Sequence, residues 1–161
     1  ADLRTNYQRI HVILAAHYLG NVTLLEFGHT YAVGLNAAIQ QLVAHDPNLV
    51  LLQDTPKFLI HPRHCIDTFL LKGSDKFCIR HTQSYLDDMK ASSNSLQQLA
   101  TKYGLSPPIG FVEKLCDSTG CNMLNDGELL YRDTNHLSFY GSDFVAQYLF
   151  EQLLERWMET P

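Results

Sequence analysis

The chain has 161 residues, 45% of them hydrophobic, so it can bury the core of one ordinary domain. Its formal net charge is −5 and no basic run exceeds two residues, which argues against a nucleic-acid-binding or anionic-membrane surface. The sequence has no run of about 18 apolar residues that would span a membrane, and its first residues, ADLRTNYQRI, lack the apolar core of a signal peptide.

The first third of the chain predicts a strand, a helix and a second strand. A short run rich in β-branched residues predicts a buried strand at residues 10–16. The apolar residues that follow have the spacing of one helix face, and Asp46-Pro47 is expected to end that helix. They are Leu35, Ala38, Ile39, Leu42 and Val43. Residues 49–53 predict another buried strand, so this order is typical of a βαβ unit with a parallel sheet.

The middle of the chain predicts a loop region and then a long helix. Residues 57–82 show no clear hydrophobic period and are expected to form a loop. Residues 85–103 have helical spacing, and Gly104 is expected to stop the helix. The apolar positions of this helix are Tyr85, Leu86, Met89, Leu96, Leu99, Ala100 and Tyr103.

Three further elements are predicted in the last third. Residues 109–112 predict a third short strand, and GELLYRD, residues 127–133, predicts an edge strand or an extended approach to a loop. The last helix is predicted at residues 142–158, and it is expected to bury Val145, Tyr148, Leu149 and Leu153. Because helices and strands alternate throughout, the predicted fold class is α/β, a layered sandwich with a parallel sheet.

The cysteines indicate either disulfides or a metal site. Four of them, an even number, fit two disulfides in three possible pairings: Cys65, Cys78, Cys116 and Cys121. The local pairing, 65 with 78 and 116 with 121, needs no long-range assumption, and it implies an oxidising compartment. The alternatives are free thiols or a zinc site made of His61, His64 and Cys65, although the cysteine spacings are not those of paired zinc knuckles.

The stretch YRDTNHLSFYGSDFVAQYLF, residues 131–150, contains candidate catalytic residues. Asp133 and His136 lie in a polar turn just before the last helix, where active sites of parallel α/β sheets are found. Histidine is the usual general base near neutral pH. A carboxylate on the same turn can bond Nδ1 of the ring and leave Nε2 free to take a proton from a hydroxyl nucleophile. His136 is therefore a candidate base and Asp133 its orienting partner.

The same turn also fits a purely structural role. Asp, Thr, Asn and Ser are the preferred residues of turns and helix N-caps. Ser138 or Ser142 can cap the last helix without any catalysis. Asp133 then caps only a turn, and His136 is a core histidine with its hydrogen bonds satisfied.

The block D-x-N-H-L-S-x-x-G-S within residues 133–142 resembles the last motif of the SGNH hydrolase superfamily. It is similar to the SGNH domains fused to bacterial membrane acyltransferases that O-acetylate surface polysaccharides. VILAAHY resembles the third-block strand of that family, LVLLQDTPKF its next strand, and KLCDSTGCN its second cysteine pair. The resemblance implies a three-layer sandwich with flavodoxin-like strand order, with Asp133 and His136 as two triad members.

The sequence also departs from this family pattern. No Gly-Asp-Ser nucleophile motif occurs, and the chain begins with what resembles the third block. Residues 1–161 are therefore expected to be the C-terminal portion of one SGNH domain, with the first strand and the serine upstream of residue 1. A divergent, inactive member is the alternative. His17 falls near the third-block Asn that donates to the oxyanion in many members, so it is an oxyanion-hole or site-lining candidate, unless it is structural.

The resemblance implies a serine-type O-acetyltransferase or acetylesterase without cofactor or metal. Its partners are an acetyl donor delivered by a membrane acyltransferase domain, a carbohydrate acceptor, and the upstream segment that carries the nucleophile. The implied location is periplasmic, tethered to the inner membrane in the full-length protein. The alternatives are a non-catalytic carbohydrate-binding or docking domain with an SGNH-like fold, and the small zinc protein.

Overall fold

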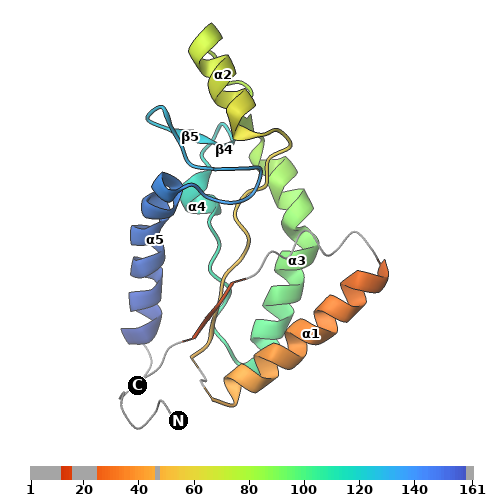
Figure 1. Ribbon diagram of the computed structural model, residues 1–161. Helices are drawn as coiled ribbons and strands as arrows, with labels where there is room; N and C mark the ends of the chain where they lie inside the picture. The colour runs from red at the N-terminus through yellow and green to blue at the C-terminus, as the bar shows by residue number, and fades with distance from the viewer. Residues whose placement is uncertain (1–11, 16–24, 46–47, 159–161) are drawn as a thin grey trace. The chain divides into compact units, whose positions relative to one another are not determined.

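The computed structural model describes residues 12–15, 25–45 and 48–158 (Figure 1). By its internal contacts the chain divides into two compact units. Unit 1 comprises Ala1–Asp54, Ala91–Ile109 and Arg156–Pro161. Unit 2 comprises Thr55–Lys90 and Gly110–Glu155.

Unit 1 contains the predicted strand, helix and strand, and its two strands are parallel. β1 (Ile13–Leu14) pairs with β2 (Val50–Leu51), and α1 (Leu25–Val43) lies between them in the chain. Leu52, which follows β2, forms a parallel bridge with Ile109, so a third segment of the chain pairs alongside the two strands. The parallel pairing across a helical connection confirms the α/β class. The predicted first strand and the Asp46-Pro47 stop lie partly or wholly outside the described residues.

Two helices supply the core of unit 1 together with β2. The fully buried cluster consists of Ile39, Leu49, Leu51, Leu96 and Ala100, contributed by α1, the β2 segment and α3 (Thr82–Tyr103). The predicted apolar faces of both helices are largely confirmed, because Leu35, Leu42 and Leu99 also pack against this cluster. Ala38 and Leu86, which the spacing placed on those faces, are exposed.

Gly104 ends α3 as the sequence predicted. Its φ of 66° lies in the left-handed region that favours glycine. The amide of Gly104 donates to the carbonyl of Thr101 at 3.3 Å, and that of Leu105 donates to Ala100 at 2.9 Å. These two bonds form a Schellman motif, which satisfies carbonyls at the end of the helix.

Unit 2 is held together by two disulfides that meet at one pair of strands. Cys65 of α2 (Pro62–Lys72) bonds to Cys78, which immediately precedes β3 (Ile79–Arg80). Cys116, which follows α4 (Val112–Leu115), bonds to Cys121 of β4 (Cys121–Asn122). β3 and β4 pair in antiparallel fashion, with Arg80 opposite Cys121. The cysteines are therefore paired locally, and the chain has no free thiol.

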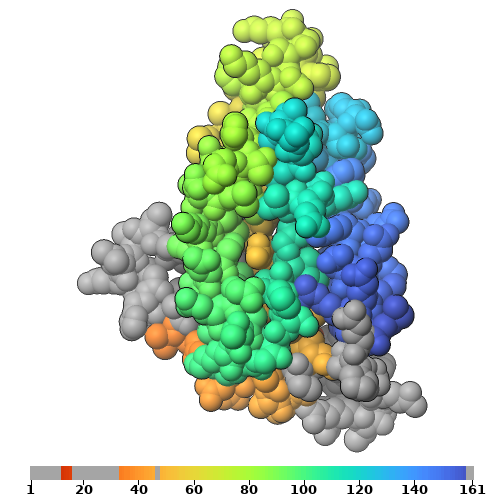
Figure 2. All heavy atoms as spheres, turned by 180° about the vertical axis from the view of Figure 1, so that it is seen from behind, coloured from red at the N-terminus to blue at the C-terminus, as the bar shows by residue number. Residues whose placement is uncertain are grey.

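The prediction of a loop at residues 57–82 is wrong, because this segment contains α2 and β3. α2 begins after His61, whose side chain accepts the amide of Arg63, with Pro62 in its first turn, and it ends at Gly73 with a φ of 61°. Leu70 and Leu71 are 73% and 82% exposed, while Cys65 and Thr68 are buried. α2 projects from the rest of its unit (Figures 1 and 2).

A tight hairpin accounts for the predicted edge strand. β5 (Leu124–Asn125) and β6 (Glu128–Leu129) pair in antiparallel fashion across Asp126-Gly127. Both turn residues have positive φ, 51° and 82°, as a type I′ turn requires. The predicted strand at residues 109–112 is wrong beyond its first residue, because α4 begins at residue 112.

The last helix, α5 (Phe139–Met158), begins three residues earlier than predicted. Of the four residues predicted to be buried, Val145 and Leu153 are buried, whereas Tyr148 and Leu149 are only half-buried. Among the described residues no helix is long and apolar enough to cross a membrane.

Candidate active site

Asp133 and His136 lie in a short closed loop between β6 and α5, residues 131–137, here called the dyad loop. Tyr131 and Leu137 form an antiparallel bridge at its base, and the amide of Arg132 donates to the carbonyl of His136 at 3.0 Å. The Tyr131 ring is fully buried and packs edge-on against Phe58, with centroids 4.8 Å apart. The loop is therefore anchored at its base by backbone pairing and by a buried aromatic side chain.

The carboxylate of Asp133 contacts the His136 ring directly. Nδ1 of His136 lies 2.8 Å from Oδ2 and 3.0 Å from Oδ1 of Asp133. Oδ1 also accepts the backbone amides of Asn135 at 3.0 Å and of His136 at 2.8 Å. One carboxylate thus fixes both the turn and the imidazole, so the structural and catalytic interpretations of this residue are compatible. Below, Asp133 and His136 are called the dyad.

The hydrogen bonds of Asp133 keep it ionised. Partial burial by itself raises the pKa of Asp133, but the amides of Asn135 and His136 and the His136 ring outweigh it and lower the pKa to about 2. An ionised carboxylate only accepts hydrogen bonds, so Nδ1 of His136 must carry the proton. In the neutral imidazole, Nε2 then has a free lone pair, which is the arrangement a general base needs.

The His136 side chain is 57% exposed and that of Asp133 is 35% exposed, so the ring is accessible to a substrate. Nε2 of His136 has no hydroxyl partner among the described residues. Nε of Arg132 lies 3.6 Å from Oδ2 of Asp133, but at 68% exposure this ion pair is worth little.

Ser138 caps α5, which settles the choice between the two candidate caps. Its Oγ accepts the amide of Gly141 at 2.9 Å and donates to the carbonyl of Leu129 at 2.6 Å. The amide of Ser142 donates to the carbonyl of Ser138, so Ser142 already lies inside the helix. The Ser138 hydroxyl therefore both donates to and accepts from the backbone, so its role is structural.

The other candidates do not join the dyad. His17 lies outside the described residues. The zinc hypothesis is contradicted, because Cys65 is bonded to Cys78 and His61 caps α2. In the part of the chain that the structure describes, no three potential metal ligands come together.

Sequence reasoning missed residues that support or flank the dyad loop. Oγ1 of Thr55 donates to the carbonyl of Asn135 at 2.9 Å, across 80 positions of sequence. Its place between Asp54 and Pro56, just after a predicted strand, was the available signal. Phe139 is 96% exposed although it directly follows the helix cap. A large aromatic residue at the first helical position was its only signal.

Comparison with known families decides the ancestry. The family model for the SGNH domain fused to AT3 domains matches residues 3–150. This chain belongs to that SGNH family. The Asp-x-x-His turn of this SGNH domain lies inside the matched region, as the resemblance of its last motif predicted. A search of curated proteins gave no match.

A solved structure with the same fold is the periplasmic domain of a lipopolysaccharide acetyltransferase from Salmonella ser. Paratyphi A. The TM-score is 0.63 and the sequence identity is 18%, with 89% of this SGNH domain covered. The likeness confirms the SGNH-type α/β fold. The match spans only 56% of that chain.

Proposed function

We propose that this SGNH domain transfers an acetyl group to or from a cell-surface carbohydrate by serine-type chemistry. His136 is the general base and Asp133 orients it. The nucleophilic serine is supplied by a segment of the same protein upstream of this chain. The observation that carries the proposal is the Asp133 contact to Nδ1 of His136, which leaves Nε2 free on a side chain that is 57% exposed.

The proposed reaction has two balanced steps. In the first, Nε2 of His136 takes the serine proton while Oγ attacks the acetyl carbonyl, and His136 then returns that proton to the departing group of the donor. In the second, His136 takes a proton from the acceptor hydroxyl, which attacks the acyl-enzyme, and the proton returns to serine. Ionised Asp133 stabilises the imidazolium formed in each step. Water in place of the acceptor makes the same chemistry an esterase reaction.

Several observations support the proposed acetyl donor and the proposed location of the domain. The family is one whose SGNH domains are fused to AT3 acyltransferase domains, which we infer deliver the acetyl donor. Two disulfides fit an oxidising compartment, and the solved relative is described as a periplasmic acetyltransferase domain. We therefore infer a periplasmic domain tethered to the inner membrane. Four free thiols in the native protein, measured by mass spectrometry without reductant, would contradict this location.

An exposed aromatic surface next to the dyad supports a carbohydrate acceptor. Phe139 is three residues beyond His136, which limits their separation to about 11 Å even in a fully extended chain. Tyr140, the next residue in the chain, is 37% exposed; its hydroxyl accepts the side-chain amide of Asn125 at 2.7 Å, and its ring stacks with that of Phe144. Flat aromatic faces offer a large contact area to the apolar face of a sugar ring at low entropic cost.

The test measures hydrolysis of p-nitrophenyl acetate by this chain, alone and with the upstream segment restored. We expect activity only with the segment present. His136→Ala should abolish it, and Asp133→Asn should lower kcat by about 10⁴-fold because the wrong tautomer is favoured. Activity of the chain alone would refute an upstream nucleophile.

Two matched controls separate catalysis from folding. His64→Ala removes another exposed histidine, one that packs on Phe77. Asp117→Asn changes a similar turn, since Oδ1 of Asp117 accepts the amides of Thr119 and Gly120 but no histidine. Both variants should keep full activity. Equal losses in the Asp117 and Asp133 variants would indicate that Asp133 acts only as a turn residue.

A further inference from the structure

The peptide units that hold Asp133 are themselves held from the other side. Asp133 accepts two amides, those of Asn135 and His136. A peptide unit is planar, so each amide is rigidly joined to the carbonyl of the preceding residue. The amide of Asn135 shares its plane with the carbonyl of Thr134, and that of His136 with the carbonyl of Asn135. Fixing these two carbonyls therefore fixes the two donors to the catalytic carboxylate.

Both carbonyls are bonded by one segment, residues 55–58. The amide of Phe58 donates to the carbonyl of Thr134 at 2.7 Å, and Oγ1 of Thr55 donates to the carbonyl of Asn135 at 2.9 Å. Phe58 is buried, and Thr55 is partly buried. In each of these two peptide units, the amide is therefore hydrogen-bonded to Asp133 and the carbonyl to residues 55–58.

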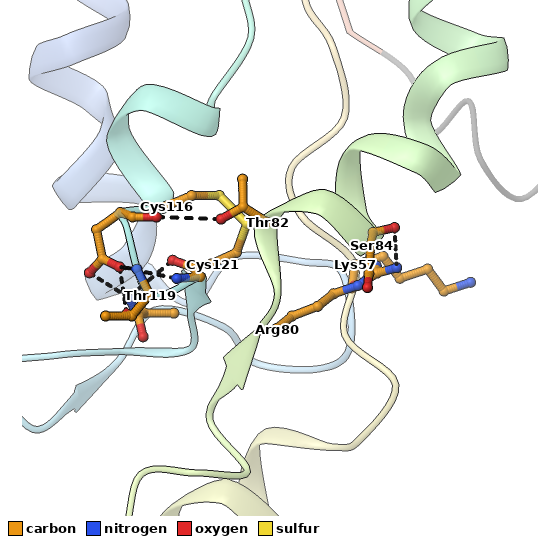
Figure 3. Close-up of a disulfide and its surroundings, with 10 residues drawn as sticks. Lys57, Arg80, Thr82, Ser84, Cys116, Thr119 and Cys121 are labelled. Carbon is orange, nitrogen blue, oxygen red and sulfur yellow. Dashed lines mark hydrogen bonds between the residues drawn. A yellow bond between two sulfur atoms is a disulfide. The ribbon is translucent and has the colours of Figure 1, made fainter.

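Arg80 holds the same segment from β3. Its Nη1 donates to the carbonyl of Lys57 and its Nη2 to the carbonyl of Ser84 (Figure 3). Nη2 also pairs with Asp88. The Arg80 side chain is only 10% exposed, whereas Asp88 is 58% exposed. A planar guanidinium can serve these acceptors at once, which a lysine ammonium on a flexible stem cannot match geometrically.

The strand that carries Arg80 is in turn fixed by both disulfides. Cys78 of the first disulfide directly precedes β3, and Cys121 of the second lies opposite Arg80 in β4. Gly120 allows this close approach, since an added Cβ would come within 2.5 Å of the Arg80 carbonyl oxygen. A continuous chain of bonds therefore runs from the disulfides through Arg80 and residues 55–58 to the dyad loop.

We propose that Thr55 and Arg80 are positioning residues of the dyad: through the two peptide units of the turn they orient Asp133 and, through it, the ring of His136. The catalytic part of this inference rests on the proposed function, but the positioning part does not. Neither residue touches the reacting atoms, so their removal should change kcat and leave KM unaltered.

The decisive variant is Thr55→Val, which keeps the shape of the side chain and removes the hydroxyl donor. The carbonyl of Asn135 then loses its partner, and the peptide that donates to Asp133 is free to rotate. We expect kcat to fall by about tenfold with unchanged KM, because small misplacements of catalytic groups are costly. Thr55→Ser, which retains the hydroxyl, should restore kcat. Activity is measured on the protein with its upstream segment.

A second readout needs no catalysis. NMR titration of the Asp133 carboxylate in the 161-residue chain should show its pKa rising from about 2 towards the ordinary value in Thr55→Val, because an amide donor is weakened. The matched control is Thr68→Val, which removes a similar bond, from Oγ1 of Thr68 to the carbonyl of His64 at 2.9 Å. The control should leave the Asp133 titration unchanged.

The outcomes are distinguishable. A shifted Asp133 titration without any acyl transfer by the parent protein would support positioning and refute the proposed function. An unchanged titration and an unchanged kcat in folded Thr55→Val would overturn the inference. If Thr55→Val does not fold, Asp88→Ala decides instead. That variant removes an exposed partner of Arg80 and should shift the titration in the same direction by a smaller amount, and no shift there would also overturn the inference.

Discussion

Gly141→Ala should destabilise the protein, although the same change inside an ordinary helix is stabilising. Gly141 lies in the first turn of α5 and packs against the backbone of Leu130. A Cβ at Gly141 would lie 1.9 Å from the carbonyl oxygen of Leu130 and 2.7 Å from its carbonyl carbon. Because these are backbone atoms, no side-chain rotation relieves the clash, and the start of the helix has to move.

The expected loss of unfolding free energy is estimated from the interactions that this movement disrupts. Displacing the helix start by about 1 Å disrupts the bond from the amide of Ser138 to Leu130, at 2.9 Å, and overpacks the contact. Overpacking costs about 1–3 kcal/mol and the lost hydrogen bond about 1 kcal/mol. The better helix propensity of alanine returns about 1 kcal/mol. We therefore expect a net loss of about 2 kcal/mol, or about 4–8 °C in Tm.

Urea denaturation measures this loss, with the single tryptophan, Trp157 of α5, as a fluorescent reporter. The matched control is Gly34→Ala in α1, where an added Cβ meets nothing within 4 Å. That control should be as stable as the wild type or more stable, by up to about 1 kcal/mol. If Gly141→Ala were equally stable, the close contact between α5 and Leu130 would be refuted.

The cap, the carboxylate and the aromatic surface each give a further prediction. Ser138→Ala should cost about 1 kcal/mol of unfolding free energy, whereas Ser142→Ala, inside the helix, should stay within about 0.5 kcal/mol of the wild type. The pKa of Asp133 is lowered to about 2, below its unfolded value near 3.9. Its stabilising contribution is therefore complete above that unfolded value and lost as pH falls towards about 2. The stability gap between wild type and Asp133→Asn should thus be flat near neutral pH and close in acid, and a gap that widens in acid would contradict the lowered pKa. Phe139→Ala should raise the KM for a methyl glycoside acceptor by about tenfold and spare p-nitrophenyl acetate hydrolysis, whereas Phe150→Ala, further along α5, should change neither. Equal effects of the two phenylalanine variants would exclude a specific acceptor surface.

Hydrophobic periodicity predicted the elements whose apolar residues face a core. α1 and α3 were found because Ile39 and Leu96 recur with neighbours at helical spacing, and each is buried. α2 was missed because its most apolar residues, Leu70 and Leu71, face solvent while its buried face includes Thr68. The third strand was overestimated because only one residue, Ile109, pairs with the sheet.

In the candidate site, the sequence predicted the contact between residues close together in the chain but not the contacts between distant segments. Asp133 and His136 are three positions apart, so a spacing rule found the contact that the structure shows. Thr55 reaches Asn135 across 80 positions, and Arg80 reaches Lys57 across 23. Such bonds depend on how distant segments meet, which periodicity and capping rules do not contain. Ser138 was one of two possible caps, and only the helix start distinguished it from Ser142.

The uneven placement of the disulfides has a consequence for folding. All four cysteines belong to unit 2, and the cross-links span only 13 and 5 positions. On the chain-entropy model, short loops of this kind remove about 2–3 kcal/mol each of conformational freedom from the unfolded ensemble. Unit 1 has no such restriction and must assemble from three segments far apart in sequence. Because high contact order slows folding, we expect the assembly of unit 1 to set the folding rate of the oxidised protein.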